Sequence, residues 1–301
     1  MTGDETSRAY SAVLVAMVSI SFASIFIKWS DSSPFVIAFY RLIFTCALLT
    51  PFILWSRGFS ELRQLRVSEW TLIALSAVAL AFHFGLWIVS LSLTLVSTSV
   101  ILVTAHPMFV AGMSHFLLRE KVRRAAAIGI VIAFSGVCVI SIADYGEASD
   151  TLFGDLLAFL GGLCAGIYFL SGRRARQRIS LGPYVFSVYL FSALMLLIAA
   201  VLVGDTLIVL EGRELSLFLL LAIVPTILGH TMFNYALKKV PAHIVSTSVL
   251  GEPVGASILA FLLLPEETPG PWIIIGGALV IMGLYIVLSR GRTDKIKDGR
   301  E

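Results

Sequence analysis

The chain has 301 residues and a formal net charge of +3; 58% of its residues are hydrophobic and only 14% are charged. A soluble domain carries about a quarter charged residues, so this composition excludes an ordinary soluble protein and indicates lipid surroundings. The modest charge favours no nucleic-acid partner, and the spacing of Cys46, Cys138 and Cys164 favours neither a metal site nor a disulfide framework.

The polar start of the chain, MTGDETSRAY, holds two acids and one arginine and lacks the basic start and small-residue cleavage site of a secretory signal. The apolar run after it is therefore expected to be a first membrane span. Windows of about 19 residues identify ten such runs, joined by short connections with turn signals such as SDSSP and SLGP. Strand-type alternation is absent, and we predict an all-α integral membrane protein with ten transmembrane helices. The runs cover residues 9–28, 34–55, 70–93, 96–117, 123–143, 154–172, 183–203, 215–237, 242–264 and 271–289.

The basic residues predict the orientation of these helices. With the N-terminus inside, nineteen lysines and arginines fall in inside segments and only Lys28 and Arg213 fall outside, while Arg41 lies within a helix. Cytoplasmic segments carry such an excess of basic residues, so both termini are expected to be cytoplasmic.

The two halves of the sequence resemble each other. HPMFVAGMSHFLLRE (106–120) aligns without gaps to EPVGASILAFLLLPE (252–266), and SPFVIAFY (33–40) aligns to GPYVFSVY (182–189) at a nearly equal offset. Two matches in the same order make chance similarity an unfavourable explanation. We predict two five-helix repeats, residues 1–148 and 149–301. Because five is odd, the second repeat is expected to enter the membrane from the opposite side, an arrangement typical of transporters.

Charges are rare inside the predicted helices. Glu252 is the one acidic residue deep within a helix and Arg41 the one basic residue, and burying a charge in lipid costs about 2.5–3.5 kcal/mol even on the gentlest scale. The hairpin turns place His83, His106, His230 and Glu252 near the bilayer midplane. His106 and Glu252 occupy matching repeat positions, each before a proline that leaves a carbonyl one turn earlier without its donor.

Each of these residues also has a structural interpretation. Glu252 is expected either to serve function or to brace its helix, and His83 and His106 could bond only to each other or to a carbonyl. Arg41 could pair with a helix end or extend its side chain outward. The glycine pairs at 161–162 and 276–277 favour close helix contacts. Aromatic residues at helical spacing fit packing as well as a mainly apolar pocket.

Enzyme signatures are missing from the sequence. It contains no H-E-x-x-H zinc motif and no phosphate-binding loop, and no catalytic residue, metal or cofactor is expected. A single arginine at cavity depth makes polyphosphate substrates unfavourable.

AHPMFVAGMSHFLLREKV, LGEPVGASILAFLLLPEE and SPFVIAFYRLIFTCALL together resemble the drug/metabolite transporter superfamily, in its EamA-type branch. Within that branch the chain is most similar to bacterial aromatic amino acid exporters of the inner membrane. The resemblance implies helices 1, 3, 4, 6, 8 and 9 around a central cavity, helices 5 and 10 as supports, and function as a monomer. His106 departs from the acidic residue of the second copy, which puts a symmetric role of the two positions in doubt.

We therefore expect an inner-membrane exporter of aromatic and other neutral amino acids, or similar small metabolites, that works by alternating access. Its partners are expected to be the substrate and the bilayer. A lipid or other metabolite translocator, and less favourably an intramembrane enzyme, are the alternatives. The predicted structural or gating residues are Arg41, Pro107 and Pro253. The predicted substrate-binding residues are Phe22, Phe26, His83, Phe84, Trp87, His106, Tyr168, His230, Phe233, Asn234 and Glu252.

Overall fold

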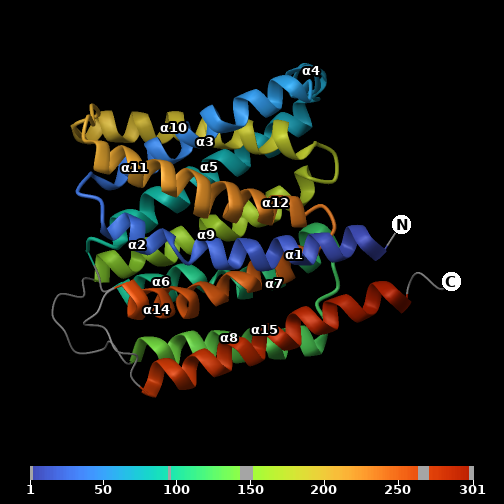
Figure 1. Ribbon diagram of the computed structural model, residues 1–301. Helices are drawn as coiled ribbons and strands as arrows, with labels where there is room; N and C mark the ends of the chain where they lie inside the picture. Colours follow the sequence, from blue (N-terminus) through green and yellow to red (C-terminus); the bar gives the residue numbers. More distant parts are fainter. Residues whose placement is uncertain (1–2, 94–95, 143–151, 264–270, 298–301) are drawn as a thin grey trace.

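The computed structural model describes residues 3–93, 96–142, 152–263 and 271–297, and every regular element in these ranges is helical (Figure 1). The first half contains α1 (Gly3–Ile20), α2 (Ala23–Lys28), α3 (Pro34–Trp55), α4 (Gly58–Gln64), α5 (Val67–Ser90), α6 (Val96–Thr104), α7 (His106–Leu118) and α8 (Arg124–Ile142). The second half contains α9 (Leu152–Ala175), α10 (Leu181–Val203), α11 (Gly212–Leu221), η1 (Ala222–Thr231), α12 (Met232–Ala236), α13 (Ala242–Ser248), η2 (Val249–Gly251), α14 (Glu252–Leu263) and α15 (Pro271–Lys297).

Six helical segments are long and apolar enough to cross a membrane: Glu5–Lys28, Pro34–Trp55, Val67–Ser90, Leu152–Ala175, Leu181–Val203 and Gly212–Ala236. Leu102–Leu118, Arg124–Val139 and Ile274–Ser289 are shorter apolar helices. The chain is therefore a multi-pass helical membrane protein. The count of ten spanning helices and the cytoplasmic placement of both termini stay predictions.

Local sequence explains where several helices start and stop. Ser33 has extended backbone and is followed by Pro34 at the first helical position of α3, where the missing N–H of proline is no loss. At the start of α5, the Glu69 side chain accepts the N–H of Arg66 at 2.8 Å. α7 ends where Arg119 turns into the left-handed region at φ 56°, and α10 ends at Gly204 with φ 79°.

Three predicted segments are interrupted helices, which corrects their expected continuity. The first breaks at residues 21–22 between α1 and α2, the fourth breaks at Ala105 between α6 and α7, and the ninth tightens into the 3₁₀ turn η2 before Glu252. The eighth stays continuous but widens into the π-helix η1 around Pro225. Within it, the Thr226 hydroxyl donates to the Leu221 carbonyl five residues earlier, at 2.7 Å. A short helix, α4, occupies a stretch predicted as a loop.

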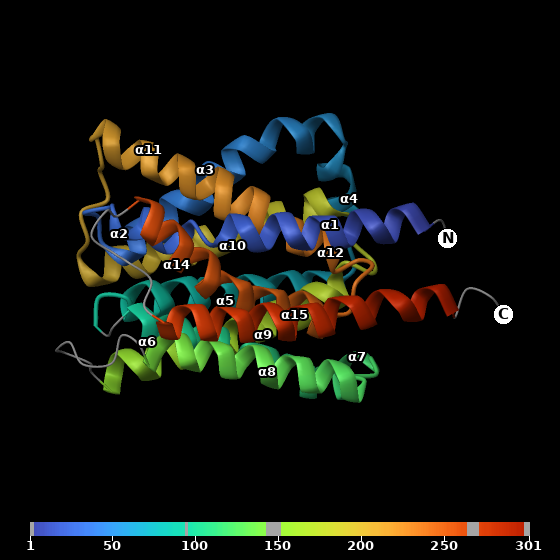
Figure 2. The same ribbon diagram turned by 60° about the horizontal axis from the view of Figure 1, so that its bottom comes forward.

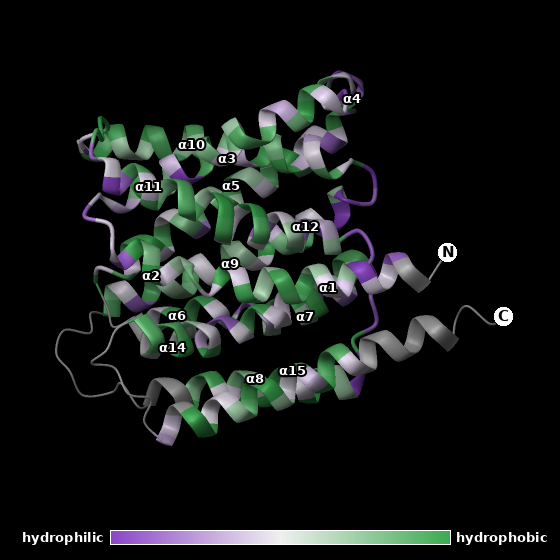
Figure 3. Cartoon of the chain, viewed as in Figure 1, coloured by the Kyte–Doolittle hydropathy of each residue, from purple (hydrophilic) through white to green (hydrophobic). Residues whose placement is uncertain are grey.

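The helices run side by side between two polar ends. α1 begins and α15 ends at the same end of the bundle, where α4 also lies, while the α2–α3 and α10–α11 connections lie at the other end (Figure 1). Figure 3 shows hydrophobic residues along the helices and hydrophilic residues gathered toward both ends. Large apolar side chains such as Val18, Leu54 and Leu202 are exposed on the outside, as expected where the neighbour is lipid.

Small residues set the closest helix contacts. α8 and α15 lie against each other in both views (Figure 2), and a Cβ added to Gly136 would lie 2.5 Å from the Gly276 carbonyl oxygen. A Cβ on Gly162 of α9 would lie 2.6 Å from the Val103 carbonyl oxygen of α6. Such distances are too short for a real side-chain atom, so the expected close helix contact is confirmed at Gly162 and at the backbone of Gly276. Gly161 and Gly277 have only ordinary neighbours, at 3.4 and 3.8 Å.

Candidate functional site

A small cavity lies among the interrupted helices, with a volume of about 40 Å³. Both halves of the chain form its wall, and among the described residues none from α8 or α15 contributes. α3, the second predicted segment, does contribute through Arg41, which the arrangement implied by the family resemblance does not include. The predicted residues that line the cavity are Arg41, His83, Trp87, His106, Tyr168, His230, Phe233 and Glu252.

Arg41 is 1% exposed and does not extend outward. Its Nε donates to the Thr226 hydroxyl at 2.6 Å, and its Cζ lies 4.2 Å from the centre of the Phe84 ring, a cation–π distance. The guanidinium Nη1 is buried without a hydrogen-bond partner. Arg41 is therefore a cationic part of the cavity wall, held by η1 and α5 rather than by a helix end.

Pro107 and Pro253 each leave the carbonyl four residues earlier without its usual N–H donor, and the two carbonyls find different donors. Pro107 cannot donate to the Val103 carbonyl, and the His106 ring does so instead, through Nδ1 at 3.0 Å. In the second copy, the Val249 carbonyl accepts the Glu252 backbone N–H through the 3₁₀ turn. The Glu252 side chain is thus not needed for the backbone. It has no hydrogen bond or ion pair among the described residues, although only 8% of the residue is exposed.

Two further histidines lie among aromatic rings. His83 shares a hydrogen bond of 3.0 Å between its Nδ1 and the Gly161 carbonyl, and it stacks on Trp87 with ring centres 6.1 Å apart. His230 meets Phe84 edge to face at 5.1 Å, and its Nδ1 is buried without a partner. His83 and His106 bond to carbonyls rather than to each other, so the carbonyl alternative holds for both.

Tyr168 and Phe169 of α9 complete the aromatic wall. The Tyr168 hydroxyl accepts a hydrogen bond from the Asn234 amide, and the Phe169 ring stacks on His106 with centres 5.5 Å apart. Phe169 and Thr104 line the cavity although neither is among the predicted residues. The remaining predicted residues do not line it: Phe22, Phe26, Phe84, Asn234, Pro107 and Pro253.

Glu120 joins three helices at the end where α1 begins. It follows the last turn of α7, and its carboxylate accepts hydrogen bonds from the Arg173 Nε at 2.7 Å and from the Ala242 N–H at 3.0 Å. One carboxylate oxygen also lies 3.8 Å from the His243 Nδ1. Burial raises the pKa of Glu120, but the His243 ring, the Arg173 charge and the backbone donor outweigh it, so the pKa lies below its ordinary value.

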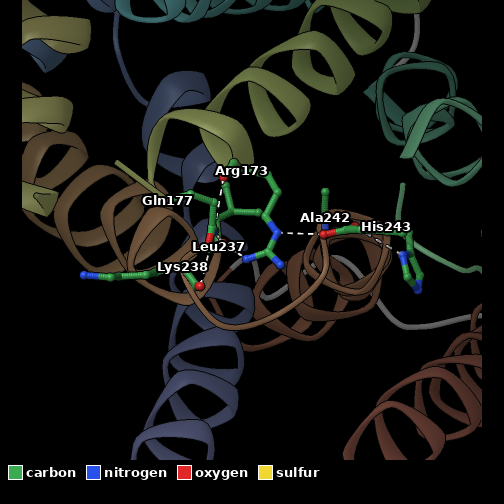
Figure 4. Close-up of polar contacts among 7 residues, drawn as sticks. Arg173, Gln177, Leu237, Lys238, Ala242 and His243 are labelled. Atoms are coloured by element: carbon green, nitrogen blue, oxygen red, sulfur yellow. Dashed lines mark hydrogen bonds and ion pairs between the residues drawn. The ribbon is translucent and has the colours of Figure 1, made fainter. Parts of the chain in front are cut away.

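The same arginine also bonds the end of α12. Arg173 and Gln177 point toward the carbonyls of Leu237 and Lys238 (Figure 4). We call Glu120, Arg173, Ala242 and His243 the inner tie. The sequence does not predict the inner tie, because Glu120 stands out there only as the residue that matches Glu266 in the repeat alignment.

The start of α11 and the connection between α2 and α3 lie at the opposite end of the bundle (Figure 1), and Glu214 joins them. Glu214 lies near the start of α11. Its carboxylate accepts hydrogen bonds from the Ser30 and Ser32 hydroxyls, at 2.5 and 2.6 Å, and from the Asp31 N–H, at 3.2 Å. We call Glu214 and residues 30–32 the outer tie. The cavity is thus flanked by a polar tie at each end of the bundle.

A multi-pass helical bundle around a mainly apolar cavity with a few polar groups is typical of a membrane transporter. Comparison with known proteins agrees: the EamA-like transporter family matches this chain twice, over residues 7–142 and 152–289. The chain belongs to the EamA-like transporter family, which confirms the resemblance inferred from the motifs.

Individual relatives are similar over most of the chain. An uncharacterized transporter of Archaeoglobus fulgidus is 25% identical over 94% of this chain and 98% of its own length. A probable amino-acid metabolite efflux pump of Salmonella typhimurium is 28% identical over 60% of this chain and 64% of its own. A solved crystal structure superposes with a TM-score of 0.80 at 19% identity, covering 98% of this chain and all of the other.

Among the described residues, no group of three or more histidine, cysteine, aspartate and glutamate side chains could hold a metal ion. Cys46, Cys138 and Cys164 are free thiols.

Proposed function

We propose that this protein exports aromatic and other neutral amino acids, or similar small metabolites, across the inner membrane by alternating access through the central cavity. In this proposal the chain is a monomer of two inverted repeats, 1–148 and 149–301, with both termini in the cytoplasm. The observation that carries the proposal is the cavity itself: it lies between the two halves and combines stacked aromatic rings with unsatisfied polar groups.

Alternating access accounts for the size of the cavity. Pockets that bind small molecules measure about 300–1,000 Å³, whereas this cavity measures about 40 Å³. Substrate entry therefore requires the helices to move apart at one end. The inner and outer ties are the polar contacts that such opening would break in turn.

The interrupted helices support a binding role for this level of the bundle. Transporter sites are commonly built where helices are discontinuous, because the freed backbone groups and helix ends lie beside the substrate. Here the α6–α7 break, η1 and η2 all contribute residues to the cavity wall.

The resemblance to a probable amino-acid metabolite efflux pump favours amino acids over other metabolites. A lipid translocator is the alternative, and it needs a groove open to the bilayer.

Proteoliposome transport tests the proposal. Purified protein should move labelled phenylalanine or threonine above empty liposomes, and Trp87→Ala should slow phenylalanine movement by about tenfold through loss of the stacked wall. Trp55→Ala is the matched control, because Trp55 is 83% exposed and lies away from the cavity. If neither amino acid moved, and Trp87→Ala and Glu252→Gln changed transport of no substrate, the proposed function would be wrong.

A further inference from the structure

The cavity wall holds a cation that the protein only partly satisfies. Arg41 is fully buried, its Nε is bonded to Thr226, and its Nη1 is buried without an acceptor. Leaving a donor of a buried charged group unpaired is costly, so a cation in such a place needs an anionic partner. No carboxylate oxygen of the described residues lies within 4.0 Å of its guanidinium nitrogens.

The same cavity holds acceptors without donors. The Glu252 side chain has no hydrogen bond or ion pair among the described residues. A carbonyl oxygen can only accept, so the His106 Nδ1 that bonds to Val103 carries the proton, and in the neutral ring Nε2 is an acceptor. This Nε2 is buried without a partner. His106 and Glu252, which occupy matching repeat positions, therefore offer two acceptors to one cavity.

Arg41 and Glu252 thus line one small space with no hydrogen bond or ion pair between them. A ligand with one anionic and one cationic group would pair with Arg41 and with the acceptors of Glu252 and His106. Such a ligand would bring no net charge into the membrane interior. A monoanion or a monocation would pair only with Arg41 or only with these acceptors.

We propose that this cavity binds the head group of an α-amino acid, with the carboxylate bound by Arg41 and the ammonium bound by Glu252 and His106. This inference rests on the proposed function and assigns the residues that bind the head group of its substrate. The amino-acid side chain lies against the rings of Trp87 and Tyr168, once the helices have moved apart. Arg41 is then a specificity residue, and its planar fork suits a carboxylate better than a lysine would.

Binding of three matched ligands tests the assignment. Isothermal titration calorimetry on the purified protein in nanodiscs would use L-phenylalanine, 3-phenylpropionate, which lacks the ammonium, and 2-phenylethylamine, which lacks the carboxylate. Wild type should bind phenylalanine at least tenfold more tightly than either analogue, the factor expected for one lost charged hydrogen bond.

The variants should separate the two head-group contacts. Arg41→Gln should weaken phenylalanine and phenylpropionate about tenfold more than phenylethylamine, and Glu252→Gln should weaken phenylalanine and phenylethylamine about tenfold more than phenylpropionate. Retained binding of the ligand that lacks the relevant group demonstrates an intact fold. Arg41→Lys, which keeps the charge, provides a second variant and should lose affinity only for the two carboxylate ligands.

The controls are an exposed arginine and an exposed carboxylate, Arg63→Gln and Glu211→Gln, which should leave all three affinities unchanged. Equal weakening of all three ligands by Arg41→Gln and Glu252→Gln would overturn the head-group assignment while wild-type phenylalanine transport still upheld the proposed function. Wild type that binds neither phenylalanine nor its analogues, and moves no neutral amino acid, would overturn both.

Discussion

Glu120→Gln isolates the charge of the inner tie without changing the size of the side chain. Each of the two short hydrogen bonds to Glu120 is charge-assisted, and such bonds contribute about 1.5–3 kcal/mol against about 1 for neutral ones. Both side chains of the ion pair are mostly buried, at 18% exposed for Arg173 and 11% for Glu120. We therefore expect the free energy of unfolding to fall by about 2 kcal/mol, roughly a 30-fold change in the unfolding equilibrium.

Equilibrium unfolding in mixed micelles, followed by tryptophan fluorescence, measures this change at pH 7. Because the pKa of Glu120 is lowered in the fold, its contribution is fully present above the ordinary carboxyl pKa of about 4.3 and is lost as the pH falls through the folded value. The difference between wild type and variant should therefore shrink below about pH 4. Glu61→Gln is the control, because the hydrogen bond that Glu61 accepts from the Ser180 N–H is exposed.

A double-mutant cycle with Arg173→Gln decides whether the two side chains act together. We expect a coupling free energy of about 1 kcal/mol or more. Additive effects of the two substitutions, within about 0.3 kcal/mol, would refute the inner tie as an energetic unit.

Two further predictions follow from the packing and from the outer tie. Gly162→Ala should destabilise the protein and lower its folded yield, because the added Cβ would lie 2.6 Å from the Val103 carbonyl oxygen. Gly112→Ala, whose Cβ would have nothing within 4 Å, should be neutral or stabilise the protein by up to about 1 kcal/mol. The melting temperatures of the two variants check this, and equal shifts would contradict it. Glu214→Ala should speed amide hydrogen exchange at residues 30–33, because three donors in that turn lose their acceptor; unchanged exchange there would contradict the outer tie.

Composition and hydropathy predict the membrane class, because both are summed over many residues, and the resemblance of three motifs implies the family. The depth argument also brings His83, His106, His230 and Glu252 to one level, and all four line the cavity. The sequence does not predict the direction of the Arg41 side chain, because a residue near the end of a membrane helix can face either the bundle interior or the outside. Its inward direction depends on Thr226, which faces it from within η1.

The hydropathy pattern does not predict the π-helix η1, because a π-helix leaves the apolar run uninterrupted. It changes only the direction in which every later side chain points. Asn234 shows the opposite limit: it was expected at the substrate, but its amide is used to bond Tyr168 and the His230 carbonyl. The inner tie joins residues more than fifty positions apart, a pairing that only the folded chain creates.

The contact between α8 and α15 has a symmetry of its own. A Cβ on Gly136 would meet the Gly276 carbonyl, and one on Gly283 would meet the Gly129 carbonyl, so the two helices run in opposite directions and each offers glycines seven residues apart. A half-turn about the middle of the contact exchanges the two helices, as in a dimer of identical subunits. The close approach therefore has no spare room on either side: a Cβ at Gly136 or at Gly283 meets a carbonyl oxygen of the other helix at the same distance, 2.5 Å.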